Sequence, residues 1–167
     1  VNDFAPYYYF AAEGTVGFLS GTKVGAILSI GTIEGTVFMD NNANGIYDGG
    51  DIPVTSGTVK LFKTDNTTDT PDDTATIQTN GTYKFTGLDI TTYNLDFSDI
   101  IGATQEFTVS KLGENDDTTK TKDSEVEYLG TNKGKVLNVN TALLSSKSVH
   151  AGVINYAKPT ITSAANV

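Results

Sequence analysis

Short stretches of alternating apolar and polar residues recur about every ten residues, and clusters of Gly, Asn and Asp separate them. Thr, Val, Ile, Tyr and Phe dominate these stretches, whereas apolar residues at helical spacing are rare. Period-two alternation places successive side chains on opposite faces of a strand, so the pattern predicts strands. The predicted strands are Ile33–Met39, Gly57–Lys63, Thr74–Thr79, Thr82–Thr86, Thr92–Phe97, Ala103–Ser110, Ser124–Leu129, Lys135–Asn140 and Ser148–Tyr156.

Strands this short, with turn residues between them, are typical of two packed antiparallel sheets. We therefore expect an all-β fold, a Greek-key β-sandwich over residues 33–156, without any helix longer than two turns. A length of 167 residues suffices for one such domain but is short for two. The Asn80–Gly81 pair between two predicted strands indicates a tight hairpin turn of the primed type, because both residues tolerate positive φ.

Residues 1–32 have a different character, with many apolar residues and only three charged ones, Asp3, Glu13 and Lys23. They predict an extended strand arm that needs a partner surface, either in its own domain or on a neighbouring subunit. The aromatic run Tyr7–Phe10 is open to a second interpretation as a carbohydrate-stacking platform. Residues 157–167, with Pro159 and small polar residues, predict a C-terminal tail. The apolar residues of the arm include Tyr7, Tyr8, Tyr9, Phe10, Val16, Phe18, Val24, Ile27, Leu28 and Ile30.

The composition narrows the class of protein. The chain has twenty acidic residues, eleven lysines and no arginine, which gives a net charge of -9. A chain this acidic lacks the basic patch that binds nucleic acid, so we expect no nucleic-acid partner. The absence of cysteine excludes disulfides and thiolate metal sites. No apolar run reaches the roughly 18–20 residues of a membrane helix, so we expect no membrane span.

The twelve residues from Asp40 to Asp51 have the spacing of a calcium-binding loop. Short oxygen-bearing side chains stand at positions 1, 3, 5, 9 and 12, and Gly45 at position 6 allows the sharp turn. Calcium needs six to eight hard oxygens, and this arrangement converges them on a curled backbone. The predicted ligands are Asp40, Asn42, Asn44, Ile46 through its backbone carbonyl, Asp48 and Asp51.

The alternative is an Asx-rich turn that binds no metal. Position 12 is Asp51 where Glu is usual, and the shorter side chain reduces the reach for bidentate binding. Strand-like sequences flank the loop, Gly35–Met39 before it and Gly57–Lys63 after it, whereas a calmodulin-like site would have helices there. The loop therefore resembles an EF-hand only in its calcium-binding segment and is expected between two strands.

At this point the chain resembles a known family, the B-type repeats of serine-aspartate surface adhesins, which are collagen-adhesin B-like sandwich modules. The resemblance covers Ile33 to Tyr156 and implies a calcium-binding β-sandwich located at the cell surface or outside the cell. It also implies further calcium ligands in a later acidic loop, for which Asp116, Asp117 and Asp123 are the matching residues, with a solvated acidic loop as the alternative. The matching segments are Gly35–Gly45, Gly57–Leu61, Asn80–Leu88 and Tyr93–Phe97.

Two functions follow from these observations. The first is a calcium-stabilised structural subunit of a surface fibre or stalk, which self-associates when its arm adds a strand to a neighbour. The second is a ligand-binding or spacer module of a larger adhesin that recognises a protein or glycan. We do not expect an enzyme, because the single histidine, His150, lies in a strand-like run without a recognisable nucleophile. Glycosylation at the sequons of Asn66 and Asn80 stays open.

Overall fold

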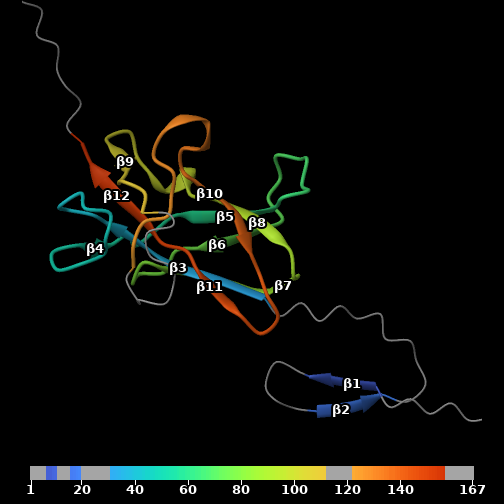
Figure 1. The fold of residues 1–167 in the computed structure, drawn as a ribbon. Helices are drawn as coiled ribbons and strands as arrows, with labels where there is room; N and C mark the ends of the chain where they lie inside the picture. The colour runs from blue at the N-terminus through green and yellow to red at the C-terminus, as the bar shows by residue number, and fades with distance from the viewer. Residues whose placement is uncertain (1–6, 11–15, 20–30, 112–121, 157–167) are drawn as a thin grey trace, which may run out of the picture.

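The structure, a computed structural model, describes residues 7–10, 16–19, 31–111 and 122–156 (Figure 1). These residues contain strands, two short 3-10 turns and no α-helix, which confirms the all-β prediction. The predicted boundary between residues 32 and 33 falls inside a strand that begins at Gly31, and the predicted boundary after residue 156 adjoins a segment outside the described residues. The elements are β1 (Tyr7–Phe10), β2 (Val16–Leu19), β3 (Gly31–Met39), β4 (Ile52–Pro53), β5 (Thr58–Lys63), β6 (Asp73–Thr76), β7 (Thr82–Leu88), β8 (Thr92–Asp96), η1 (Ser98–Ile100), β9 (Gln105–Phe107), η2 (Gly130–Asn132), β10 (Lys135–Asn140), β11 (Ser146–Ser148) and β12 (Ala151–Asn155).

Two sheets build the sandwich. The first is an antiparallel sheet in the order β10-β8-β5-β6. The second is organised around β3, which pairs antiparallel with β7 and β4 and parallel with β11 and β12, while β9 extends the sheet from β12. Parallel partners require a crossover connection, and here the chain crosses from β10 in the first sheet to β11 in the second (Figure 1). The β-sandwich predicted from the sequence is thus confirmed.

The core lies between the two sheets and follows the alternation in the sequence. In β5, Val59 and Leu61 are fully buried while their neighbours are partly exposed. Tyr83 packs edge-on against two other aromatic rings, Phe85 at 5.9 Å and Phe97 at 5.6 Å between centroids. The largest fully buried side chains are Tyr83, Tyr93, Phe38, Phe85, Phe97, Ile33, Leu61, Leu95, Val37, Val59, Val126 and Val153. Burial of each contributes roughly 1.5–3 kcal/mol, so this set dominates the favourable free energy of folding.

Most predicted strands are present with shifted ends, and one prediction is wrong. Ser124–Leu129 forms no strand, because its backbone bonds go to separate segments: Ser124 N–H to Gly45, and Glu125 N–H to His150. A single isolated bridge, from Ser124 to His150, marks this stretch, although Val126 within it is fully buried. The predicted strand Ser148–Tyr156 is interrupted at positions 149–150, where β11 ends and β12 begins.

The Asn80–Gly81 turn also differs from its prediction. Gly81 has φ +82°, but no positive φ occurs at Asn80, so this is not the primed hairpin turn that the dipeptide suggested. Gly81 N–H donates to the Gln78 carbonyl at 2.8 Å, and the Gly81 carbonyl accepts from Val37 N–H at 2.8 Å. After the turn, β7 pairs with β3 and not with β6, so β6 and β7 lie in different sheets.

The tightest backbone approach in the second sheet lies at Gly35. A Cβ atom at this position would lie 1.6 Å from the Val149 carbonyl oxygen and 2.9 Å from the Tyr83 ring. The same carbonyl accepts the Tyr83 hydroxyl at 2.7 Å, and Val149 N–H donates to the Glu34 carbonyl at 2.9 Å. The segment between β11 and β12 therefore rests directly on the backbone of β3, and only glycine leaves room for it.

We predict that Gly35→Ala lowers the free energy of unfolding by at least about 2 kcal/mol, because backbone and not a flexible side chain blocks the added methyl group. Gly49→Ala is the matched control, since nothing lies within 4 Å of its added Cβ atom. Urea denaturation of both variants measures the difference. Equal midpoints for the two variants would contradict the close packing at Gly35.

Tyr83 predicts how stability depends on alkaline pH. Burial raises the pKa of its phenol well above the usual range, and the nearby charge of Glu125 raises it further. A pKa that is higher in the folded than in the unfolded chain stabilises the fold fully below about pH 10, and this stabilisation is lost as the pH rises beyond that value. The parent should therefore lose stability above pH 10 more steeply than Tyr83→Phe in thermal unfolding. Identical pH profiles would show that Tyr83 does not titrate on unfolding.

Candidate metal centre

The sandwich fixes both ends of the loop from Asp40 to Asp51. Asp40 follows β3 directly, and its N–H donates to the Val153 carbonyl of β12 at 2.7 Å. At the other end, Ile52 of β4 pairs with Met39 of β3. The loop is therefore the closed tip of a hairpin, and its first residue is only 2% exposed.

The Asp40 carboxylate is held by groups inside and outside the loop. Its Oδ2 accepts the Gly45 N–H at 2.7 Å and the Thr108 hydroxyl at 2.6 Å, and its Oδ1 accepts the Asn44 N–H at 3.2 Å. A buried carboxylate needs such donors, because its desolvation is costly. Thr108 is itself 1% exposed and lies next to β9, so it ties the loop to the body of the sandwich.

The middle of the loop brings Asn42, Asn44 and Asp48 together. The side-chain amide of Asn42 donates to Asp48 Oδ1 at 3.2 Å, and that of Asn44 donates to Asp48 Oδ2 at 2.8 Å. The amide oxygens of both asparagines accept a backbone N–H two residues ahead, at Asn44 and Ile46, in Asx turns. Three of the predicted ligand side chains thus lie within hydrogen-bond reach of one another.

Asp51 closes the loop on its own backbone. Its Oδ1 accepts the Asn41 N–H at 2.8 Å, and its Oδ2 accepts the Asp48 N–H at 3.1 Å. Asn41 adds a side-chain bond to the Gly50 carbonyl at 2.6 Å. The second and last positions of the loop are therefore joined, which closes the loop.

Backbone conformation explains the glycine at position 6. Gly45 has φ +82°, and an added Cβ atom would lie 2.8 Å from the Val109 carbonyl oxygen. Ala43, two residues before it, has φ 58°, a left-handed value that is uncommon for a non-glycine residue. These two left-handed residues curl the chain in the first half of the loop.

An acidic residue from outside the loop, Asp123, lies against it. Asp123 forms an isolated bridge with Ile46, and flanking backbone bonds join Tyr47 N–H to the Lys122 carbonyl at 2.7 Å and Ser124 N–H to the Gly45 carbonyl at 2.8 Å. Asp123 is 2% exposed. The other two predicted residues of the later acidic loop, Asp116 and Asp117, lie outside the described residues.

The oxygen atoms of this loop suit a hard cation such as calcium. In the part of the chain that the structure describes, no three His, Asp or Glu side chains meet in a group that could hold a metal ion. A cation in the loop would therefore depend on amide and backbone oxygens as well as carboxylates. Ligation by Asn42 and Asn44 would require each amide to present its oxygen to the ion on the side where its NH2 group donates to Asp48.

Thr108 is the supporting residue that sequence reasoning missed. It sits 68 positions from Asp40, inside the predicted strand Ala103–Ser110, and nothing in its local sequence marks it as a carboxylate partner. His150, by contrast, is buried as a packed residue should be. It is 9% exposed, and its Nδ1 accepts the Thr36 N–H at 3.0 Å.

Comparison with known proteins relates this geometry to a family. No curated protein matches the sequence. A solved structure, GBS52, the minor pilin of the Gram-positive pathogen Streptococcus agalactiae, is similar with a TM-score of 0.45 and 10% sequence identity; the match covers 98% of this chain and 66% of the pilin. No helix in the described ranges is long and apolar enough to cross a membrane.

The sequence itself carries the assignment. Residues 29–153 match the SdrD B-like domain, a span that includes β3 to β11, the Asp40–Asp51 loop and most of β12. This match confirms the resemblance to the B-type repeats of serine-aspartate adhesins that the motifs indicated. The chain belongs to the SdrD B-like domain family.

Proposed function

We propose that this chain is a calcium-stabilised extracellular structural subunit of a surface fibre or stalk, and that it assembles by strand addition through its N-terminal arm. The observation that carries the proposal is the hairpin of β1 and β2, which forms a two-stranded sheet of its own. Family membership supports a cell-surface module whose role is structural and not catalytic.

The hairpin has the properties of an exchangeable element. β1 and β2 pair in register, with Tyr8 opposite Phe18 and Phe10 opposite Val16. A two-stranded hairpin alone is marginally stable in water, so this apolar ribbon gains stability when one of its edges joins a larger sheet. Backbone pairing of this kind is a common mode of recognition between protein chains.

The sandwich offers edges that can accept such a strand. Within the described ranges, β7 pairs only with β3, and β6 pairs only with β5. β7 is the longer of the two, at seven residues, and it points Lys84 and Thr86 outward while Tyr83 and Phe85 are buried. An incoming strand along β7 would extend the second sheet of a neighbouring copy.

The proposed calcium site is the Asp40–Asp51 loop at the end of β3. Asp40, Asn42, Asn44, Asp48, Asp51 and the Ile46 carbonyl would hold the ion, which would supply positive charge among three carboxylates of a chain with net charge -9. Asp123 beside the loop, with Asp116 and Asp117 further along the chain, would add to the ligand set. Bound calcium would lower the repulsion between copies and so favour association.

A second candidate is a ligand-binding or spacer module of a larger adhesin. The observation in its favour is that the family match begins at residue 29, so that the arm precedes the matched domain. In this reading the arm would belong to a neighbouring domain of the same protein. Self-association of the chain separates the two candidates, because only the fibre subunit requires it.

We predict that millimolar calcium raises the melting temperature and that Asp40→Ala abolishes the effect. At ten to a hundred times a Kd of about 10⁻⁴–10⁻³ M, linkage adds roughly 1.4–2.7 kcal/mol. Calorimetric titration and thermal unfolding in calcium and in chelator measure both quantities. Asp65→Ala, which removes one exposed carboxylate outside the loop, is the matched control and should respond to calcium like the parent. Absence of calcium binding by the parent would refute the site.

A second prediction concerns the arm. Tyr8→Asp with Phe18→Asp puts two like charges directly opposite each other in the hairpin, which destabilises the pairing. The variant should stay monomeric in light scattering under conditions where the parent polymerises with calcium. Thr67→Asp with Thr79→Asp adds the same charge at exposed positions of the sandwich and controls for repulsion. Normal polymerisation of the hairpin variant would rule out arm-driven assembly.

A further inference from the structure

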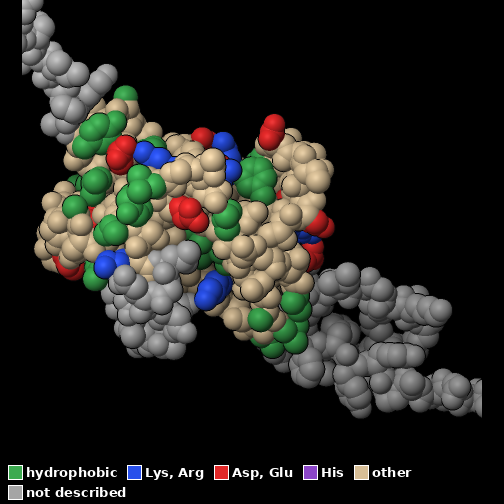
Figure 2. All heavy atoms as spheres, turned by 45° about the horizontal axis from the view of Figure 1, so that its top comes forward, with side chains coloured by type: hydrophobic (Ala, Val, Ile, Leu, Met, Phe, Trp, Pro, Cys, Tyr) green, Lys and Arg blue, Asp and Glu red, His purple; other side chains and the backbone are tan. Residues whose placement is uncertain are grey.

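One end of the sandwich carries an apolar patch formed by Ile90, Leu143 and Leu144. The three side chains are 52%, 61% and 70% exposed. They lie on two turns, the one between β7 and β8 and the one between β10 and β11. Figure 2 shows hydrophobic side chains gathered at this end of the sandwich.

The turn that carries the two leucines is unfavourable by local rules. Ser145 N–H donates to the Ala142 carbonyl at 3.2 Å, so Leu143 and Leu144 occupy the central positions of a β-turn. Leu144 has φ 54°, a left-handed conformation that Gly or Asn adopts more readily. A turn built from two exposed leucines, one of them in a disfavoured conformation, is not explained by folding of the monomer and points to a role in contact with another surface.

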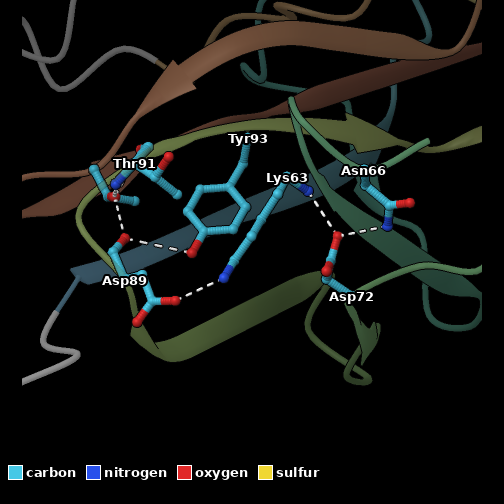
Figure 3. Close-up of polar contacts among 7 residues, drawn as sticks. Lys63, Asn66, Asp72, Asp89, Thr91 and Tyr93 are labelled. Carbon is cyan, nitrogen blue, oxygen red and sulfur yellow. Dashed lines mark hydrogen bonds and ion pairs between the residues drawn. The ribbon is translucent and has the colours of Figure 1, made fainter. Parts of the chain in front are cut away.

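The turn that carries Ile90 is held rigidly against it. Thr141 joins the two turns: its hydroxyl donates to the Asp89 carbonyl at 2.6 Å, and its N–H donates to the Thr91 carbonyl at 3.0 Å. From the other side, Lys63 Nζ pairs with Asp89 Oδ2 at 2.7 Å, and the Tyr93 hydroxyl donates to the Asp89 carbonyl (Figure 3). The patch is therefore preorganised, which lowers the entropic cost of contact with a partner.

The arm leaves the sandwich next to this patch. Gly31, the first residue of β3, pairs with Leu88, and a Cβ atom at Gly31 would lie 3.0 Å from Thr141 Cβ. Residues 20–30, eleven in number, connect the end of β2 to Gly31. Even a fully extended connection of this length spans at most about 40 Å. Any copy that holds the hairpin must therefore lie within about 40 Å of this end of the sandwich.

We infer that Ile90, Leu143 and Leu144 form the surface on which a second copy is seated, namely the copy that takes up this chain's arm. The inference rests on the proposed function and extends it, because it gives the arm contact a second, rigid component. Strand addition alone leaves two subunits free to swing about the connecting segment. An apolar patch beside the arm, bordered by the Lys63–Asp89 ion pair, has the apolar centre and polar rim of a protein interface and would fix the angle between the copies.

The test uses the full chain and the variant Leu143→Asp with Leu144→Asn. Asn tolerates the left-handed conformation, so the turn is retained and the monomer keeps its fold. Leu129→Asn is the matched control, since Leu129 is 65% exposed and lies near the opposite end of β10, before Lys135. In calcium, the patch variant should raise the critical concentration for polymerisation by roughly a hundredfold or more, as the loss of two leucines buried in the contact implies. The control should polymerise like the parent.

Three outcomes would count against the inference or its basis. Polymerisation of the patch variant at the parent's concentration, while the Tyr8→Asp and Phe18→Asp variant stays monomeric, overturns the patch as an interface and leaves the proposed function standing. Normal polymerisation of the hairpin variant overturns the proposed function itself. Faster tryptic cleavage at Lys23 in monomeric patch variant than in monomeric parent shows that the chain's own arm covers the patch, which also overturns the inference.

Discussion

The pairing of β3 with the C-terminal strands is the constraint on which the rest of the structure depends. Gly35 lets the Val149 backbone lie directly against β3, and this contact sets where β11 ends and β12 begins. β12 then runs beside the last residues of β3 and accepts the Asp40 N–H through Val153. The candidate metal centre is therefore positioned by a contact between residues more than a hundred positions apart.

That dependence explains which features the sequence could predict. Strand alternation and the calcium-loop spacing depend on neighbouring residues alone, so the sequence could predict strands β5 and β8 and the position of the Asp40–Asp51 loop. The support of Asp40 by Thr108 is not local, and no pattern near Thr108 announces it. The irregular backbone of Ser124–Leu129 has the same origin. Its alternation predicted a strand, but its bonds are divided among Gly45, His150 and Lys135.

The Asn80–Gly81 turn shows a second limit. The dipeptide favours a primed hairpin when both flanking strands pair with each other. Here β7 pairs with β3 instead, and the Gly81 carbonyl receives the Val37 N–H. The turn conformation depends on the pairing of β7 with β3 as well as on the dipeptide itself. The position of the turn could therefore be predicted from the sequence, but its type could not. Asp123 against Ile46 is a similar case, since two acidic segments far apart in sequence share one bridge.

The parallel arrangement of β3 and β12 has a mechanical consequence. β3 starts at Gly31 at one end of the sandwich, and β12 runs in the same direction to Asn155 at the other end. Tension applied to the two ends of the domain would therefore pull these adjacent strands along their length in opposite directions. Their hydrogen bonds, which lie across the strands, would be loaded together in shear and would not open one at a time as in a peeled hairpin. Resistance to pulling would then be governed by the unfolding barrier of this one strand pair.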